Sequence, residues 1–127
     1  MQQHEISTAL APSAIGPYSQ AIAHGGLVYC SGQIPLDPAT GNLVTESIEA
    51  ETHQVMKNLK AVLQAAGSDL HGILRTTIYL QNLENFAKVN DVYASYLSKP
   101  YPARATIQVA KLPRGASVEI DAIARQL

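Results

Sequence analysis

The chain has 127 residues, a formal net charge of −1, 15% charged residues and 46% hydrophobic residues. This length predicts a single domain over residues 1–127, with one hydrophobic core. The near-neutral charge excludes the strongly basic or acidic proteins that bind nucleic acid or membrane surfaces through charge alone. Because soluble domains carry roughly 25% charged residues, we expect an oligomer to bury part of this charge-poor surface.

The cysteine content and the N-terminus predict the compartment. Cys30 is the only cysteine, so an intrachain disulfide is impossible and an oxidising compartment gains no support. Residues 1–5 are polar and have no apolar signal core. No apolar run approaches the roughly 18 residues that suggest a membrane-spanning helix. We therefore expect a cytoplasmic protein without a membrane segment.

The first third of the chain predicts an edge strand, a loop and a hairpin. Residues 4–7 are a candidate edge strand, and Gly16 and Pro17 interrupt the loop that follows. The apolar runs 20–24 and 27–34 flank two glycines, which is typical of strands joined by a two-residue turn. Cys30 lies within the second run, where we expect a small buried side chain.

Two residues in this region are candidates for a binding site. Tyr18 directly follows the Gly16–Pro17 break, where it would either line a pocket or pack at the rim of the core. Gly32 follows Ser31 at the end of the second hairpin strand. It either lets a ligand approach the backbone closely or only ends the strand.

Two helices are predicted in the middle of the chain. Residues 46–66 repeat apolar side chains with a 3.6-residue period, carry acidic residues at the start and stop at Gly67. A second helix is expected over 83–97, with Asn82 or Asn85 as its cap. Its apolar stripe has Asn90 as a neighbour, and this polar amide needs a hydrogen-bond partner.

Strand 73–81 lies between the helices, and two more strands follow them. The order of elements favours an α/β or α+β fold with both helices on one face of a mixed sheet. The other face is left for water or for a neighbouring subunit, and the scarcity of charge favours a subunit. In strand 73–81 the side chains expected on one face are Leu74, Thr76, Ile78 and Leu80.

The last two strands each place a charge within an apolar run. Arg104 suits a carboxylate ligand because its planar fork makes two charge-assisted bonds, and Glu119 suits the handling of a water or a proton. Alternatively, both are ordinary solvated or ion-paired charges of a sheet. Alternation predicts that both leave the face that packs the core. That face would receive Ala103, Ala105, Ile107, Val109, Val118, Ile120 and Ala122, and the opposite face Arg104, Thr106, Gln108, Glu119 and Asp121.

Several kinds of chemistry have no motif in the sequence. The four histidines show no metal-ligand spacing, and a Cys-x-x-Cys pair is impossible, so we expect no metal. Glycine-rich nucleotide-binding motifs and a Gly-x-Ser-x-Gly nucleophile elbow are both missing. The basic residues are scattered among acids, without the aromatic–basic pattern of RNA-binding modules, so no nucleic-acid partner is expected.

An ordered set of motifs, running nearly end to end, resembles the RidA (YjgF) family. A single motif would be weak, but the set in this order is specific. Its members are Ile15–Gln20, Ser31–Pro35, Ala65–Gly67, Arg75–Leu80, Phe86–Asn90, Pro102–Ala105, Leu112–Pro113 and Val118–Ala122.

The resemblance implies a fold, an assembly and a reaction. The expected fold is α+β and chorismate-mutase-like, with a six-stranded mixed sheet and two helices on one face. Three such chains would form a barrel-like homotrimer with ligand sites in the clefts between subunits. The implied activity is hydrolysis of reactive enamines and imines, of the 2-aminoacrylate/2-iminopropanoate and 2-iminobutanoate type, to 2-keto acids and ammonia. It implies no cofactor.

The resemblance also assigns roles to residues. Arg104 matches the arginine that grips the substrate carboxylate, and Glu119 matches the acid near the attacking water. Some relatives have a cysteine where this chain has Thr106, which argues against thiol chemistry and leaves open whether the Thr106 hydroxyl holds substrate. The expected substrate-binding positions are Tyr18, Ser31, Gly32, Asn90, Arg104, Ala105 and Thr106.

Two other functions stay open from the sequence. The same Arg104 pocket would serve a trimer that only binds 2-keto acids or similar carboxylates and regulates another process. An RNA-cleaving, translation-inhibiting role is reported for some members of the family. The near-neutral net charge of −1 disfavours this second alternative.

Overall fold

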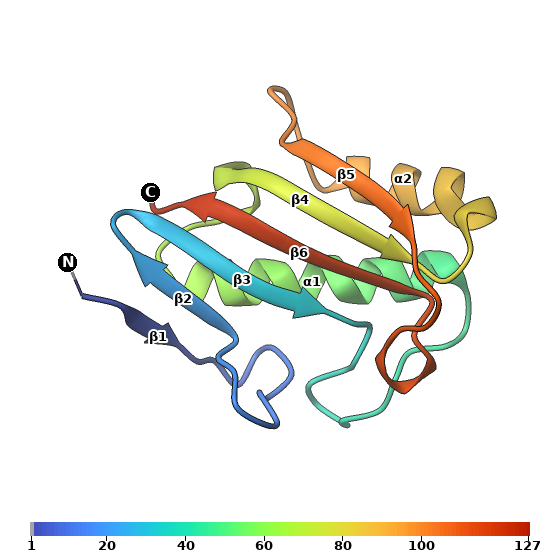
Figure 1. Cartoon of the computed structure of the whole chain (residues 1–127), viewed down its shortest axis with the longest axis horizontal. Helices are drawn as coiled ribbons and strands as arrows, with labels where there is room; N and C mark the ends of the chain where they lie inside the picture. The colour runs from blue at the N-terminus through green and yellow to red at the C-terminus, as the bar shows by residue number, and fades with distance from the viewer. Residues whose placement is uncertain (1) are drawn as a thin grey trace.

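The computed structural model describes residues 2–127 as a six-stranded mixed sheet with both helices packed on one face (Figure 1). The strand order is β1-β2-β3-β6-β4-β5, and only β4 and β5 run parallel. This architecture confirms the predicted α+β class. The elements are β1 His4–Ile6, β2 Ala21–His24, β3 Leu27–Gln33, α1 Ile48–Ala65, β4 Ile73–Leu80, α2 Phe86–Ser95, β5 Ala103–Gln108 and β6 Val118–Arg125.

The predicted hairpin is β2 and β3, joined by the two glycines. Gly25 and Gly26 have φ values of 60° and 80°, which glycine adopts without the steric penalty of a Cβ atom. His24 therefore pairs directly with Leu27, and the register continues along both strands. β1 pairs with β2 as the short edge strand that the sequence predicts.

Helix α1 is the longer of the two helices and covers the middle of the sheet. It begins two residues later than residue 46, because Ser47 is extended and its hydroxyl accepts a hydrogen bond from the Ala50 N–H at 3.0 Å. It ends before Gly67, whose φ of 76° reverses the chain. Its fully buried apolar side chains form the centre of the core: Val55, Met56, Leu59, Val62 and Leu63.

Helix α2 lies over β4 and β5 on the same side of the sheet as α1 (Figure 1). A short 3-10 helix, Leu83–Asn85, precedes it, so the predicted range 83–97 contains two kinds of helix. Asn82 caps the 3-10 helix by accepting a hydrogen bond from the Glu84 N–H at 3.0 Å. The Asn85 side chain makes no capping hydrogen bond, so of the two predicted cap residues only Asn82 acts as one.

The predicted face of β4 is wrong at its first position. Leu74 is 46% exposed, whereas Thr76, Ile78 and Leu80 are buried as expected. The register with β6 shifts between Ile73 and Arg75, and this irregularity turns Leu74 away from the core. Buried and exposed side chains of β4 therefore alternate as predicted only after this irregularity.

The predicted faces of β5 are inverted. Arg104 pairs with Thr76 and Thr106 pairs with Ile78, and paired residues of neighbouring strands share a face. Arg104 and Thr106 therefore lie on the side of the helices, and the expectation that Arg104 leaves that side is wrong. Ala103, Ala105 and Ile107 lie on the open face. The prediction failed because apolar alternation shows which side chains share a face of the strand, but not which of the two faces the helices cover.

The open face of the sheet carries large apolar side chains. Tyr29 and Ile107 are 44% and 45% exposed there, and Ile123, opposite Tyr29, is half-buried. Figure 1 shows this face toward the viewer, with both helices behind it. Across residues 2–127, none of the helices is both long enough and apolar enough to cross a membrane.

Candidate functional site

The two charged residues singled out by the sequence lie in different cavities of the chain. Arg104 is opposite Thr76 on the helix side, whereas Glu119 is opposite Tyr79 on the open side. Three residues of β4 separate these register positions, which is about 10 Å along the strand. One copy of the chain thus presents two separate candidate sites, one built around each charge, and they are called the first and second half-site below.

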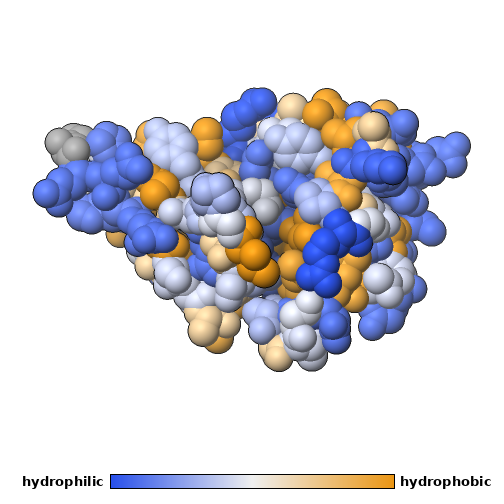
Figure 2. Space-filling view, turned by 60° about the horizontal axis from the view of Figure 1, so that its bottom comes forward, coloured by the Kyte–Doolittle hydropathy of each residue, from blue (hydrophilic) through white to orange (hydrophobic). Residues whose placement is uncertain are grey.

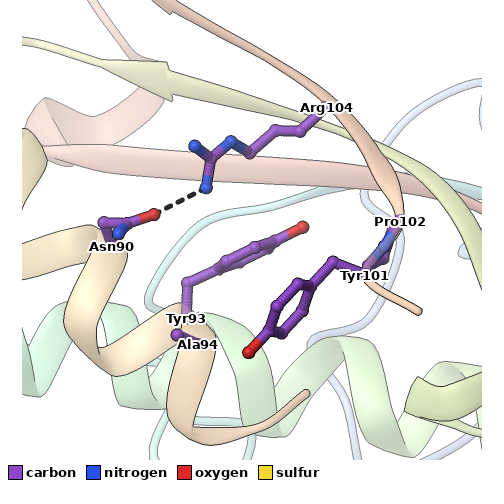
Figure 3. A pocket seen from close by; sticks show the side chains of 6 residues that line it. All are labelled: Asn90, Tyr93, Ala94, Tyr101, Pro102 and Arg104. Carbon is purple, nitrogen blue, oxygen red and sulfur yellow. Dashed lines mark hydrogen bonds between the residues drawn. The ribbon is translucent and has the colours of Figure 1, made fainter. Parts of the chain in front are cut away.

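The first half-site lies between the edge strand β5 and helix α2 (Figure 3). Arg104 points from β5 toward α2, and its Nη1 donates to Asn90 Oδ1 at 2.6 Å. This contact supplies the partner that the Asn90 amide needs. The cavity has a volume of about 450 Å³ and is lined by Asn90, Tyr93, Ala94, Tyr101, Pro102 and Arg104.

Two aromatic rings hold the guanidinium of Arg104 in place. Its central carbon lies 5.2 Å from the centroid of the Phe86 ring and 5.4 Å from that of the Tyr93 ring. Both distances are within the range of cation–π attraction. The Tyr93 hydroxyl is itself fixed by a buried hydrogen bond of 2.7 Å to Thr76 Oγ1. The arginine is therefore oriented before a ligand binds, with several of its five N–H donors available.

The neighbours of Arg104 on β5 differ in their placement. The Thr106 hydroxyl lies on the same side of the sheet as Arg104 and is buried without a hydrogen-bond partner in residues 2–127. Such an unpaired buried group is uncommon in proteins. Ala105 lies on the opposite face, so its side chain points away from the Arg104 cavity.

The second half-site is a larger cavity that brings together four of the predicted residues. Loops from three parts of the chain meet there, at the lower edge of Figure 1. Figure 2 turns this edge forward and shows apolar surface interrupted by strongly hydrophilic atoms. The cavity measures about 630 Å³, and its lining includes Tyr18, Ser31, Gly32, Arg114 and Glu119.

The position of the Glu119 side chain depends on Gly32 of the neighbouring strand β3. A Cβ atom at Gly32 would overlap the Glu119 carboxylate, so only glycine leaves room for this rotamer. The register between β3 and β6 shifts between Cys30 and Gln33, the segment that contains Gly32. Gly32 was expected to admit a ligand or to end the strand, and here the group that approaches its backbone is the Glu119 side chain.

The environment of Glu119 makes it a suitable proton carrier. Burial raises the pKa of Glu119, and the charge of Asp121 raises it further. Asp121 accepts hydrogen bonds from the Tyr79 hydroxyl at 2.9 Å and from the Thr77 N–H at 3.2 Å. A carboxyl group whose pKa is displaced toward neutrality can accept and return a proton. Alternation along the strand predicts that Asp121 shares the face of Glu119, whereas only the strand register places Tyr79 opposite Glu119. Neither residue was predicted to have a role in the site.

The loop that carries Tyr18 is held by a buried glutamine. The side-chain N–H groups of Gln20 donate to the carbonyls of Thr8 (3.0 Å) and Pro12 (2.8 Å), and its Oε1 accepts from the Thr8 N–H at 2.7 Å. The Ser31 hydroxyl donates to the Ser19 carbonyl at 2.6 Å. Tyr18 is 53% exposed at the cavity, which favours the pocket-lining alternative.

Thiol and metal chemistry receive no support from the arrangement of side chains. Cys30 is buried, and burial together with the charge of Asp121 raises the pKa of its thiol to about 12. In the described part of the chain, no group of three or more His, Cys, Asp or Glu side chains is arranged to hold a metal ion.

The fold and the two cavities define a class: a small α+β protein with an oriented arginine at one cavity and a half-buried acid with a raised pKa at the other. The family model described as endoribonuclease L-PSP matches residues 8–126. The chain therefore belongs to this family, which confirms its resemblance to RidA.

Individual relatives and structures agree with this assignment. A mouse 2-iminobutanoate/2-iminopropanoate deaminase is 49% identical, covering 95% of this chain and 90% of its own length. A Rid-family crystal structure from Yersinia pestis has a TM-score of 0.95 at 51% identity and covers 98% and 99% of the two chains. Escherichia coli TdcF with bound serine has a TM-score of 0.92 at 36% identity, with coverage of 98% and 99%. This chain is thus similar to imine deaminases of the Rid family.

Proposed function

We propose that the protein hydrolyses 2-imino acids, such as those formed from 2-aminoacrylate, to 2-keto acids and ammonia. The observation that carries the proposal is the guanidinium of Arg104, held by Asn90, Phe86 and Tyr93 at the edge of a cavity. An oriented, partly unoccupied guanidinium is suited to a carboxylate, which every 2-imino acid carries. The similarity to a mouse deaminase with this activity supports the same reaction.

In the proposed reaction, Glu119 takes a proton from a water molecule while the water oxygen bonds to the iminium carbon. The C=N electron pair moves to nitrogen and leaves a tetrahedral carbinolamine. Glu119 then returns its proton to the nitrogen, and the C–N bond breaks to release ammonia. The hydroxyl proton passes to the Glu119 carboxylate as the keto group forms, and from there to ammonia, so that Glu119 is again ionised. The sum is iminium carboxylate plus water to 2-keto acid plus ammonium. Arg104 contributes by orienting the carboxylate, so neither a metal nor a covalent nucleophile takes part.

We further propose that each complete site lies between two subunits of a homotrimer. Arg104 and Glu119 belong to different cavities on opposite sides of the sheet, so a neighbouring copy is needed to join the two halves. The exposed apolar side chains of the open face, including Tyr29 and Ile107, support burial against such a copy. In this proposal Tyr18, Ser31 and Gly32 accompany Glu119, and Asn90 and the unpaired Thr106 hydroxyl accompany Arg104.

The activity is tested by coupling a serine or threonine dehydratase to the protein and following keto-acid formation. Semicarbazide competes for the free imine, so acceleration above the trapped background measures hydrolysis. We expect acceleration by the wild type and its loss in Arg104→Ala. If neither protein changes the rate although calorimetry detects 2-keto acid binding, the function is binding. RNA cleavage or RNA affinity that rises steeply at low salt would favour the nucleic-acid alternative.

The shared site is tested by mixing two inactive variants. Arg104→Ala and Glu119→Gln chains are co-refolded, so that a mixed trimer joins an intact Arg104 to an intact Glu119 at some interfaces. Random assortment in a ring of three should restore roughly one quarter of wild-type activity. Activity that stays at the level of the separate variants would contradict a site shared between subunits.

A further inference from the structure

A strained arginine lies at the Glu119 cavity and has no role in the reaction proposed above. Arg114 has φ 58° and ψ 19°, and within residues 2–127 it is the only non-glycine residue with positive φ. This conformation costs an L-residue about 1–2 kcal/mol, and such residues concentrate at functional sites. Glycine would adopt the turn without that strain, so the arginine at this position calls for a role of its side chain.

The Arg114 side chain is exposed at the rim of the cavity. Its Nη1 donates to the carbonyl of Gly41 at 3.3 Å, which connects the turn after β5 with the loop after β3. The Gly41 turn is itself held by a 2.8 Å hydrogen bond from the Gly41 N–H to the Asp37 carbonyl. A guanidinium has five N–H donors, so this single anchor leaves donors for a ligand.

The cavity is larger and more varied in chemistry than a three-carbon substrate requires. Its volume of about 630 Å³ lies within the range of roughly 300–1,000 Å³ that accommodates drug-sized ligands. Arg114 is the one basic residue in its lining, and Glu119 is the one acidic residue. Apolar side chains complete the wall: Pro12, Ile15, Ile34, Leu36 and Pro113.

This combination fits a particular kind of substrate side chain. Apolar walls favour methylene groups, and the cation at the rim favours an acidic group at their end. We propose that Arg114 is a specificity-determining residue that binds a side-chain carboxylate, so that the site accepts 2-imino dicarboxylates of the 2-iminoglutarate type. The assignment rests on the proposed deaminase function. Arg104 would hold the α-carboxylate, and hydrolysis at the imine carbon would proceed as written above.

The test compares two imines that differ in the side-chain carboxylate. Amino-acid oxidases with catalase generate 2-iminoglutarate and 2-iminobutanoate, and semicarbazide traps whatever the protein does not hydrolyse. Arg114→Gly removes the guanidinium and suits the left-handed turn, so it is expected to fold. Lys111→Ala is the matched control, because this exposed cation lies in the same turn but not in the cavity lining.

For Arg114→Gly we expect kcat/KM for 2-iminoglutarate to fall about tenfold or more, as expected for loss of a charge-assisted contact. The kcat/KM for 2-iminobutanoate should fall much less than that for 2-iminoglutarate, and Lys111→Ala should leave the ratio between the two imines unchanged. Equal losses for both imines, or no loss for either, would overturn the assignment.

Binding separates this assignment from the proposed activity. If the wild type hydrolyses neither imine, the deaminase function fails, and calorimetry with 2-oxoglutarate and 2-oxobutanoate still tests Arg114. We expect the wild type to bind 2-oxoglutarate more tightly, and we expect Arg114→Gly to lose that preference. A preference that persists in Arg114→Gly, or that is missing from the wild type, would refute the role of Arg114.

Discussion

The Arg104 and Glu119 cavities are built in different ways. The charge of the first is held by direct contacts, since Asn90, Phe86 and Tyr93 on one helix fix the guanidinium of Arg104. In the second cavity, the Glu119 carboxylate occupies a space that exists only because Gly32 has no side chain. The first cavity thus presents an oriented cation, which suits the proposed binding role, and the second presents an acid with a raised pKa, which suits the proposed proton transfer.

Because the two cavities are built differently, we expect them to respond differently to mutation. Removing a contact from the Arg104 cavity leaves a guanidinium that is still charged but less well oriented. Adding even one methyl group to the Glu119 cavity displaces the acid itself. The following changes test this contrast, from the largest expected effect to the smallest.

Arg104→Ala should have the largest effect. We expect kcat/KM for 2-iminobutanoate to fall about 30- to 1,000-fold, or 2–4 kcal/mol, because a charge-assisted fork is lost. Arg104→Lys keeps the charge but not the planar fork, so its kcat/KM should lie between those of the wild type and Arg104→Ala. Arg125→Ala, at the exposed end of β6, is the control and should retain full activity. An active, folded Arg104→Ala protein would remove Arg104 from the site.

Gly32→Ala should mainly reduce kcat. The added Cβ overlaps the end of the flexible Glu119 side chain, which must turn away, so we expect a loss of at least about tenfold in kcat and only a small fall in unfolding temperature. The same change in a Glu119→Ala background should have little effect on stability, because the colliding group is gone. Equal destabilisation in both backgrounds would show that Gly32 serves the backbone rather than Glu119.

Asn90→Ala should affect binding more than turnover. Arg104 keeps its aromatic neighbours but loses the 2.6 Å hydrogen bond, so we expect KM to rise about fivefold, equivalent to roughly 1 kcal/mol. Asn85→Ala is the matched control, because this amide precedes the same helix and makes no cap. A fall in kcat with unchanged KM would mean that Asn90 acts in the chemical step.

Glu119→Gln should have a small, pH-dependent effect on stability. Burial and Asp121 raise the pKa of Glu119 in the folded state, so the wild type loses stability as the pH rises through that value. The neutral glutamine has no such loss. We therefore expect the variant to unfold at an equal or slightly higher temperature at pH 7, with the gap closing near pH 4, below the unfolded pKa of about 4.3. Thermal unfolding between pH 4 and pH 8 measures this, and a gap that widens on acidification would contradict the assigned pKa direction.

The sequence by itself determined the elements of the fold, because these depend on neighbours along the chain. The glycine pair of the β2–β3 turn and the 3.6-residue period of α1 are local signals, and both elements form where they were predicted. The sequence also indicated Arg104 and Glu119, because a charge within an apolar strand stands out. Its ordered motifs identified the family, which the family model confirms over residues 8–126.

The tertiary structure alone decided which side of the sheet each charge occupies. Alternation along β5 separates two faces but cannot say which face the helices cover, and pairing with Thr76 places Arg104 on the helix side. The bulge that exposes Leu74 depends likewise on pairing with β6. The cavity of Tyr18, Arg114 and Glu119 joins loops about a hundred residues apart, and no local pattern records such contacts. Register and long-range packing are properties of the folded chain, so only the structure could separate the two half-sites.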